Sequence, residues 1–338
     1  MKFAVRLLNI AIICAAIPLF ASAGPDGELT KRTRYLMDTY CSVLAPVKGD
    51  QKITAALDLA LDRVEELDKK FSAFRPGSPV YEFNKNGTPI TDPETLGLVK
   101  RCLDMNQQSG GAFDITVTPL VKLWGFYGEI PKVPMIPSKE AIAAAQKMIG
   151  PGSIELKNGK LIKLRSSAEI DLGAGAKAYA VGEAMKSLKK SGVRSAMVDL
   201  GGDLYAIGLY NGKPWKAGIK NPRGEGALGI LGMTELSMST SGDYERYYEI
   251  EGKRYCHVID PLKGAPASEL ISVAVLTPDA TMANLLSTSV FVLGREKGLK
   301  LLKKYPGAEA IIIGADGGIS LTDGLTKLFS LKEKGGKQ

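Results

Sequence analysis

Apolar residues recur at three- and four-residue spacing in several segments, which is the pattern of amphipathic helices. In residues 53–71 the apolar side chains have this spacing and the charged ones fall on the other side. The same pattern over residues 96–107 stops at a Gly pair, a usual helix end. Further helices are predicted over residues 139–148, 178–191 and 282–293. The apolar set in the first helix is Ala56, Leu59, Val64, Leu67 and Phe71.

Shorter apolar runs between turn residues predict strands. Residues 155–164 predict a hairpin with Asn158-Gly159 at its turn. Three prolines in residues 129–140 predict an irregular surface loop. Strands in runs with helices among them favour an α+β architecture with substantial antiparallel sheet. The remaining predicted strands are 196–207, 215–219, 228–234, 247–251, 271–276 and 310–313.

The first 23 residues have the pattern of a secretory signal, with early cations, an apolar run over 7–20, and Ala21-Ser22-Ala23. We expect cleavage after Ala23, one domain over 24–331, a disordered basic tail over 332–338, and a periplasmic location in a bacterial source. Lipidation of Cys14 and an uncleaved membrane anchor remain alternatives. The apolar run is shorter than the roughly 20 residues that span a bilayer.

Amino-acid composition limits the kinds of metal site and ligand that the chain can have. The chain has 338 residues, a net charge of +8 and a single histidine. A His-rich metal site is therefore excluded, and oxygen ligands favour magnesium or calcium. The positive charge suits an anionic ligand or peripheral contact with the inner membrane. It is scattered and forms no basic-aromatic module, which argues against nucleic acid. Cys41, Cys102 and Cys256 match no zinc or redox spacing.

Two polar clusters come first along the chain. Asp114 and Thr116 are explained by a local turn more readily than by a ligand. Trp124 and Phe126, which follow them, are expected in the core. Residues 171–180 run from a strand into a helix, and their small residues together with Lys177 could admit a pyrophosphate. An ordinary tight turn is the alternative.

Three more clusters follow. Gly201-Gly202, between Asp199 and Asp203, leaves room for a ligand or marks a sharp bend. Residues 239–246 are dense in hydroxyls and charge. His257 beside Asp260 suits proton transfer, although a lone histidine in a strand is often simply packed. The side chains at 281, 284 and 288 share one helical face, either as three convergent oxygens or as a solvated surface.

In order and spacing these clusters resemble the ApbE family, the FAD:protein FMN transferases. The resemblance extends from Met37-Asp38-Thr39 to the helix at 281–294 and is strongest over 113–126, 171–180, 201–203, 240–247 and 257–264. It implies an α+β fold with a single large T-fold-like domain, antiparallel sheets, packed helices and FAD in a cleft. It also implies transfer of FMN from FAD to a Thr or Ser hydroxyl of an acceptor, with AMP released and Mg²⁺ required.

The resemblance implies roles for particular residues and partners. The acceptors would be subunits of membrane redox complexes. The metal would be held by the backbone carbonyl of Ala176 and the side chains of Asn284 and Thr288. His257 and Asp260 would flank the reacting phosphates, with His257 or a nearby carboxylate accepting the hydroxyl proton. The residues implied to contact FAD are Met37, Lys177, Gly201, Gly202, Asp203, Ser241, Gly242 and Asp243.

The chain departs from the family pattern in several places. Asn284 stands where the family usually has Asp, which should weaken a hard-cation site. Ser78 is retained but Pro79 follows it where the family usually has Ser-Glu, and Asp38 and Ala178 replace glycines. Two other functions therefore remain open, an FAD pyrophosphatase that forms FMN and AMP without an acceptor, and a non-catalytic FAD-binding protein.

Overall fold

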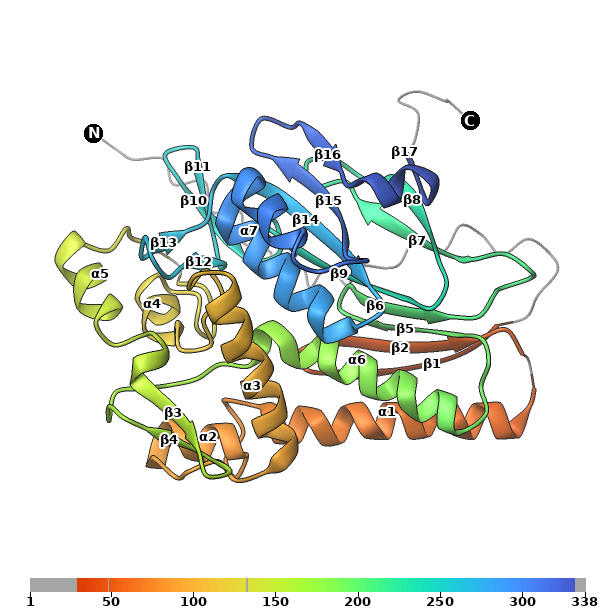
Figure 1. Cartoon of the computed structure of the whole chain (residues 1–338), viewed down its shortest axis with the longest axis horizontal. Helices are drawn as coiled ribbons and strands as arrows, with labels where there is room; N and C mark the ends of the chain where they lie inside the picture. Colours follow the sequence, from red (N-terminus) through yellow and green to blue (C-terminus); the bar gives the residue numbers. More distant parts are fainter. Residues whose placement is uncertain (1–28, 48, 132, 332–338) are drawn as a thin grey trace.

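The computed structural model of the chain describes residues 29–331 except 48 and 132, so the predicted signal segment and basic tail lie outside the described residues. An eight-stranded sheet forms the centre (Figure 1). Every neighbouring pair in it is antiparallel. In spatial order its strands are β1 (Thr30–Leu36), β2 (Thr39–Ala45), β5 (Ala196–Leu200), β6 (Asp203–Ile207), β9 (Leu236–Gly242), β14 (Leu270–Thr277), β15 (Glu309–Gly314) and β16 (Ile319–Leu321).

Helices α1 (Gln51–Phe71), α6 (Gly173–Lys190) and α7 (Ala280–Leu302) pack against one face of this sheet and against one another (Figure 1). Their buried apolar stripes and the sheet form the main core. None of the helices in the described ranges is long and apolar enough to cross a membrane. The remaining helices are α2 (Pro79–Asn86), α3 (Pro93–Gln108), α4 (Thr118–Leu123), α5 (Lys139–Gln146), η1 (Pro151–Ser153) and η2 (Asp323–Lys327).

The other face of the central sheet is covered by a second, three-stranded sheet of β17 (Phe329–Leu331), β8 (Ala227–Met233) and β7 (Trp215–Lys220). Because side chains alternate along a strand, Val198 faces the helices while Met197 faces the second sheet. Three hairpins complete the fold. They are β3 (Ile154–Lys157) with β4 (Lys160–Lys163), β10 (Tyr247–Ile250) with β11 (Lys253–Cys256), and β12 (Ile259–Asp260) with β13 (Ala265–Pro266).

The sequence predictions are confirmed where the signal is local. Asn158 and Gly159 both have positive φ at the turn between β3 and β4, as an Asn-Gly hairpin requires. The predicted strand over 196–207 is wrong as one element, because Gly201-Gly202 reverse the chain and make it the β5–β6 hairpin. Leu59 was expected in the core of the first helix but is 54% exposed.

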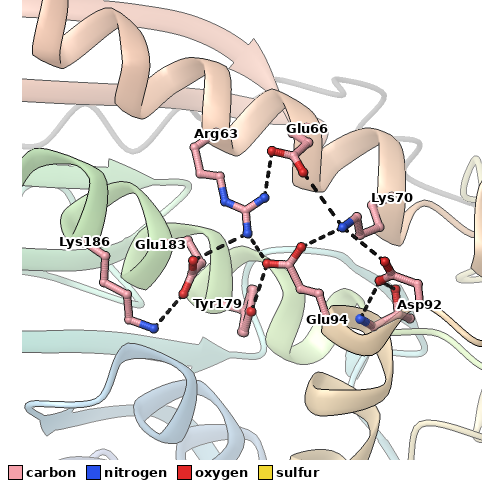
Figure 2. Close-up of polar contacts among 9 residues, drawn as sticks. Arg63, Glu66, Lys70, Asp92, Glu94, Tyr179, Glu183 and Lys186 are labelled. Atoms are coloured by element: carbon pink, nitrogen blue, oxygen red, sulfur yellow. Dashed lines mark hydrogen bonds and ion pairs between the residues drawn. The ribbon is translucent and has the colours of Figure 1, made fainter. Parts of the chain in front are cut away.

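A polar network ties α1, α3 and α6 together (Figure 2). Glu94 binds Arg63, lies 2.7 Å from Lys70 Nζ and accepts a 3.0 Å hydrogen bond from the Tyr179 hydroxyl. Burial favours the neutral acid, but the bonds from Lys70 and Tyr179 outweigh it and hold the pKa of Glu94 below its ordinary value. Arg63 also reaches Glu183 on α6. The network therefore fixes α6, whose first turn carries Lys177.

The three described cysteines, Cys41, Cys102 and Cys256, are free and buried. Burial raises the pKa of the Cys41 and Cys102 thiols to about 12 and that of Cys256 to about 11. No internal disulfide forms among these three residues, and thiols with such pKa values stay protonated at neutral pH.

Candidate functional site

The start of α6 is an irregular turn that leads into a regular helix. Asp171 Oδ1 accepts a 2.7 Å hydrogen bond from the backbone N–H of Gly173. Gly175 has φ 136°, a conformation that L side chains rarely adopt, and regular helix begins only at Ala176. A Cβ on Gly175 would lie 3.5 Å from the Leu285 side chain of α7. The first helical turn, with Ala176 and Lys177, therefore lies close to α7.

Two hairpin turns lie side by side at the same end of the sheet. Gly201 and Gly202 both have positive φ between β5 and β6, and Met37 and Asp38 do so between β1 and β2. A Cβ on Gly201 would come within 2.8 Å of Thr39 Cγ2. Only glycine permits this approach, so the structure brings the predicted FAD contacts Met37, Gly201 and Gly202 into one region.

Asp203, at the start of β6, belongs to a buried polar cluster under α7. The Ser239 hydroxyl donates to Asp203 Oδ1. Asn284 Nδ2 donates to Ser239 Oγ at 2.9 Å and to Asp203 Oδ1 at 3.4 Å. Burial raises the pKa of Asp203, opposed by the nearby positive charge of Lys177 and by these hydrogen bonds. Predicted FAD and metal residues thus meet in one cluster.

A second group of hydroxyls continues this cluster by one helical turn. Ser241 Oγ lies 3.0 Å from Ser287 Oγ and 3.4 Å from Thr288 Oγ1. Ser287 also donates to the backbone carbonyl of Asn284 at 3.0 Å. The alternate positions 239 and 241 of β9 therefore face the helical positions 284, 287 and 288, and line one oxygen-rich strip.

The donor atoms of this strip fit a hard cation. Among the described residues, Asn284 Oδ1 is one of two buried side-chain polar atoms without a hydrogen-bond partner; the other is Thr118 Oγ1, on α4. The described ranges contain no group of three or more His, Cys, Asp or Glu suited to a metal. A cation here would depend on neutral oxygens, with Asp203 as the nearby negative charge. Magnesium and calcium accept such ligands.

His257 follows β11, and Arg246 sets its hydrogen bonding. The His257 backbone N–H donates to the Arg246 carbonyl at 2.9 Å, and ring Nδ1 lies 3.3 Å from the same oxygen. Burial, with the positive charges of Arg246 and Lys177, lowers the pKa of His257 to about 4. The ring is therefore neutral near pH 7. Because the Arg246 carbonyl can only accept, it favours the tautomer with hydrogen on Nδ1, which leaves Nε2 free to take up a proton.

Lys177 connects the predicted clusters electrostatically. Burial raises the pKa of Asp171 and of Asp203, and the charge of Lys177 opposes both shifts. The same charge helps to keep His257 neutral. Lys177 therefore lies near three titratable groups from three separate segments, as a cation that binds phosphates would.

Two of the predicted site carboxylates have other partners. Asp260 Oδ1 accepts hydrogen bonds from the backbone N–H groups of Leu262 and Lys263 at 2.9 and 3.1 Å, and so caps its own turn. Asp243 is paired with Arg223 and lies 3.6 Å from Arg254 Nη1. Gly242, beside it, packs so tightly against the Tyr244 ring that a Cβ would overlap it. Direct ligand contacts by these three residues stay predictions.

The interpretation of the first polar cluster as a local turn is confirmed. Asp114 accepts hydrogen bonds from the Thr116 N–H and hydroxyl at 2.7 and 2.6 Å, which is a local turn. Trp124 and Phe126 are buried in a small core with residues of α5, β10 and β12. The sequence placed Ser239 at the start of a candidate cluster but gave it no role in the site. The alternation of serine at positions 237, 239 and 241 of one strand was the available signal.

Proteins with a similar sequence are transferases. A FAD:protein FMN transferase from Haemophilus influenzae is 33% identical over 303 residues, covering 84% of this chain and 87% of the relative. One from Treponema pallidum is 30% identical over 318 residues, covering 87% of each. The chain is an enzyme of the transferase class, as predicted.

Solved structures of ApbE proteins are similar to this chain in fold and sequence. The apo form of the flavinyl transferase ApbE from Pseudomonas stutzeri has a TM-score of 0.78 at 32% identity, covering 90% of this chain and 97% of that one. The ApbE protein of Thermotoga maritima has a TM-score of 0.81 at 30% identity, covering 89% and 99%. This chain belongs to the ApbE family, whose pattern it matches over residues 37–312. The predicted family and its α+β fold are confirmed.

Proposed function

We propose that this chain is a FAD:protein FMN transferase. A Thr or Ser hydroxyl of an acceptor protein attacks the FMN phosphorus of FAD, the pyrophosphate bond breaks, and AMP leaves. The product carries FMN through a phosphoester. The observation that carries the proposal is that the charge of Lys177 acts on Asp171, Asp203 and His257, and that Asp203 belongs to the polar cluster under α7. The flavin in this proposal comes from the similar proteins, which are named FAD:protein FMN transferases.

Binding and orientation of FAD are the first task of the site. The N–H groups of the first turn of α6 and the Lys177 ammonium favour the negative pyrophosphate. Gly201 and Gly202 let the ligand approach the backbone of the hairpin, with Met37 beside them. Ser241 adds a hydroxyl on the strip below α7. Holding FAD and the acceptor hydroxyl in line supplies much of the rate enhancement in phosphoryl transfer.

Magnesium dependence is part of the proposal. The residues that would hold the ion are Ala176 through its carbonyl, Asn284 through Oδ1 and Thr288 through its hydroxyl. When bound, the ion neutralises charge on the phosphates and so stabilises the charge that builds up as the bond breaks. The unpaired, buried Asn284 Oδ1 supports this assignment.

His257 is proposed to accept the acceptor's hydroxyl proton. Its pKa of about 4 keeps the ring neutral, and the Nδ1 contact with Arg246 directs Nε2 toward proton transfer. Asp260 then contributes by capping the turn that follows His257, in addition to its predicted place beside the phosphates.

Asn284 favours one other function. A neutral amide in place of a carboxylate lowers the charge at the cation site, which suits a protein that binds FAD without turning it over. An FAD pyrophosphatase would use the same groups with water as the nucleophile. Both alternatives differ from the transferase in what happens to an acceptor.

The place of action is proposed from the N-terminal segment. We propose export to the periplasm and acceptors among the subunits of membrane redox complexes, with a peripheral position at the inner membrane favoured by the net positive charge. Fractionation of cells that express the chain with a C-terminal tag tests this. Recovery in the cytoplasm alone would contradict it.

The decisive experiment incubates the purified chain with FAD and Mg²⁺, with and without a Thr-bearing acceptor domain. We expect the acceptor to gain the mass of one FMN with release of one AMP, and a Thr→Ala acceptor to gain nothing. AMP formed equally without acceptor would identify a pyrophosphatase. Intact FAD in every reaction would identify a binding protein.

A further inference from the structure

The Asn284 amide has only one orientation that satisfies its neighbours. Ser239 gives its single hydrogen to Asp203 Oδ1, so its lone pairs face Asn284. Both hydrogens of Asn284 Nδ2 then have acceptors, at 2.9 and 3.4 Å. A rotated amide would turn Oδ1 toward a carboxylate and a hydroxyl whose hydrogen is already used. Asp203 and Ser239 therefore determine that Oδ1 points the other way.

The outward side of this amide is incomplete. Within the part of the chain that the structure describes, no group donates to Asn284 Oδ1, although the side chain is buried. A buried acceptor without a donor loses the hydrogen bonds that water would give it, and is therefore destabilising. Thr288 lies one helical turn further on the same face of α7, with its hydroxyl near Ser241. An acceptor left unpaired beside other oxygens is what a cation would complete.

We propose that Asp203 and Ser239 are positioning residues for the divalent cation, and that they act through Asn284. The inference rests on the magnesium dependence in the proposed function. Asp203 and Ser239 hold the amide so that its oxygen faces the ion, and the carboxylate of Asp203 supplies the negative charge that Asn284 lacks.

A cation beside Asn284 would also favour the ionised form of Asp203, because a nearby positive charge stabilises a carboxylate over the neutral acid. In a poorly hydrated interior a carboxylate one side chain away from a cation still attracts it strongly, because the effective dielectric constant is low. Asn284→Asp would place a negative charge directly on the ion. It would also bring a second carboxylate next to Asp203, because Asn284 Nδ2 lies 3.4 Å from Asp203 Oδ1. Asn284 removes that repulsion and keeps one carboxylate behind the ligand. Such outer partners typically change metal affinity 10–100-fold.

The test separates orientation from charge. Mg²⁺ is titrated into the purified full chain, with and without FAD, by calorimetry and by its effect on Tm. Asp203→Ala removes both acceptor and charge, and we expect a Kd for Mg²⁺ raised roughly 10–100-fold. Asp203→Asn keeps an acceptor oxygen, and Ser239→Ala keeps the charge. Each should weaken Mg²⁺ binding by less than Asp203→Ala. If Asp203→Ala fails to fold, weaker Mg²⁺ binding by both of these variants is the expected result.

Asp199→Asn is the matched control. Asp199 is a buried carboxylate on the same hairpin, and strand alternation places it on the opposite face of the sheet from Asp203. Its substitution should leave the Kd for Mg²⁺ unchanged. A purely structural Asp203 would lower the Tm without Mg²⁺ and leave the Kd as in the wild type, which overturns the inference alone. A wild type that binds no Mg²⁺ under either condition overturns both the inference and the magnesium dependence.

Discussion

Two polar clusters, one partly exposed and one buried, differ in whether the protein's own side chains satisfy their hydrogen bonds. In the network between α1, α3 and α6, Glu94 has partners in Arg63, Lys70 and Tyr179 (Figure 2). In the cluster under α7, Asn284 uses its nitrogen and leaves its oxygen unpaired. Polar groups that the chain satisfies fix its helices in place, whereas the unsatisfied Asn284 oxygen is where we propose that a cation binds.

The largest effect is expected in the proposed site that contains the incomplete cluster. His257→Gln removes the proton acceptor but keeps a polar side chain of similar reach, so the transfer rate should fall roughly 10²- to 10⁴-fold while the Tm changes little. FMN transfer to a Thr-bearing acceptor and thermal unfolding measure the two quantities. A wild-type rate would assign the proton to another group.

The completed network should show the reverse behaviour. Glu94→Gln leaves Arg63 and Lys70 without their shared carboxylate, and we expect a loss of about 2 kcal/mol in the free energy of unfolding, below the value for fully buried pairs because these groups keep some contact with water. The transfer rate should stay within about threefold, since no reacting group changes. Urea unfolding tests the first part.

Glu296→Gln is the matched control for this prediction, because Glu296 pairs with Lys300 on the exposed surface of α7. Its stability should match the wild type. Equal stability of Glu94→Gln and Glu296→Gln would show that the network contributes nothing.

A smaller effect is expected when the incomplete cluster is given a second carboxylate. Asn284→Asp should lower the Tm without metal, because the new charge faces Asp203, and should tighten Mg²⁺ binding by about tenfold, because the charge then lies on the ion. Tm measured with and without Mg²⁺ shows both changes. If both Tm values equal those of the wild type, position 284 does not contact the ion.

The smallest effect is expected when the pH is varied. With a pKa of about 4, His257 stays neutral from pH 8 to pH 5, so the transfer rate should be nearly constant there and fall as the pH drops through about 4. Its folded pKa lies below the ordinary 6.5, so the unfolded chain binds more protons between these values, and folding stability decreases as the pH falls from 6.5 to 4. His257→Gln should flatten this part of the stability curve. A wild-type rate that falls near pH 6.5 would contradict the lowered pKa.

Local chemistry predicted much of the fold. The Asn158-Gly159 turn and the helical face of Asn284 and Thr288 depend on neighbours a few residues apart, which a sequence displays directly. The same local logic succeeded only in part for 196–207, which was predicted as one strand although Gly201-Gly202 was recognised as a possible sharp bend. The prediction that Leu59 is buried was wrong, because the spacing of apolar residues does not show how wide a face of the helix the rest of the protein covers.

The site was predicted less completely because it depends on long-range contacts. The sequence and the family resemblance gave Asp203 and Asn284 separately, but their contact spans 81 positions. The partners of Asp243, namely Arg223 and Arg254, were equally invisible. Only the folded chain shows which carboxylates are already occupied and which oxygen is not.

The buried thiols also make the protein its own unfolding probe. Cys41 lies in the central sheet, Cys102 on α3 and Cys256 at the end of β11, so together they sample three regions of the fold. A thiol reagent can reach them only when the surrounding structure opens. Labelling rates resolved by peptide mass would therefore report which region opens first, with no added fluorophore or engineered cysteine.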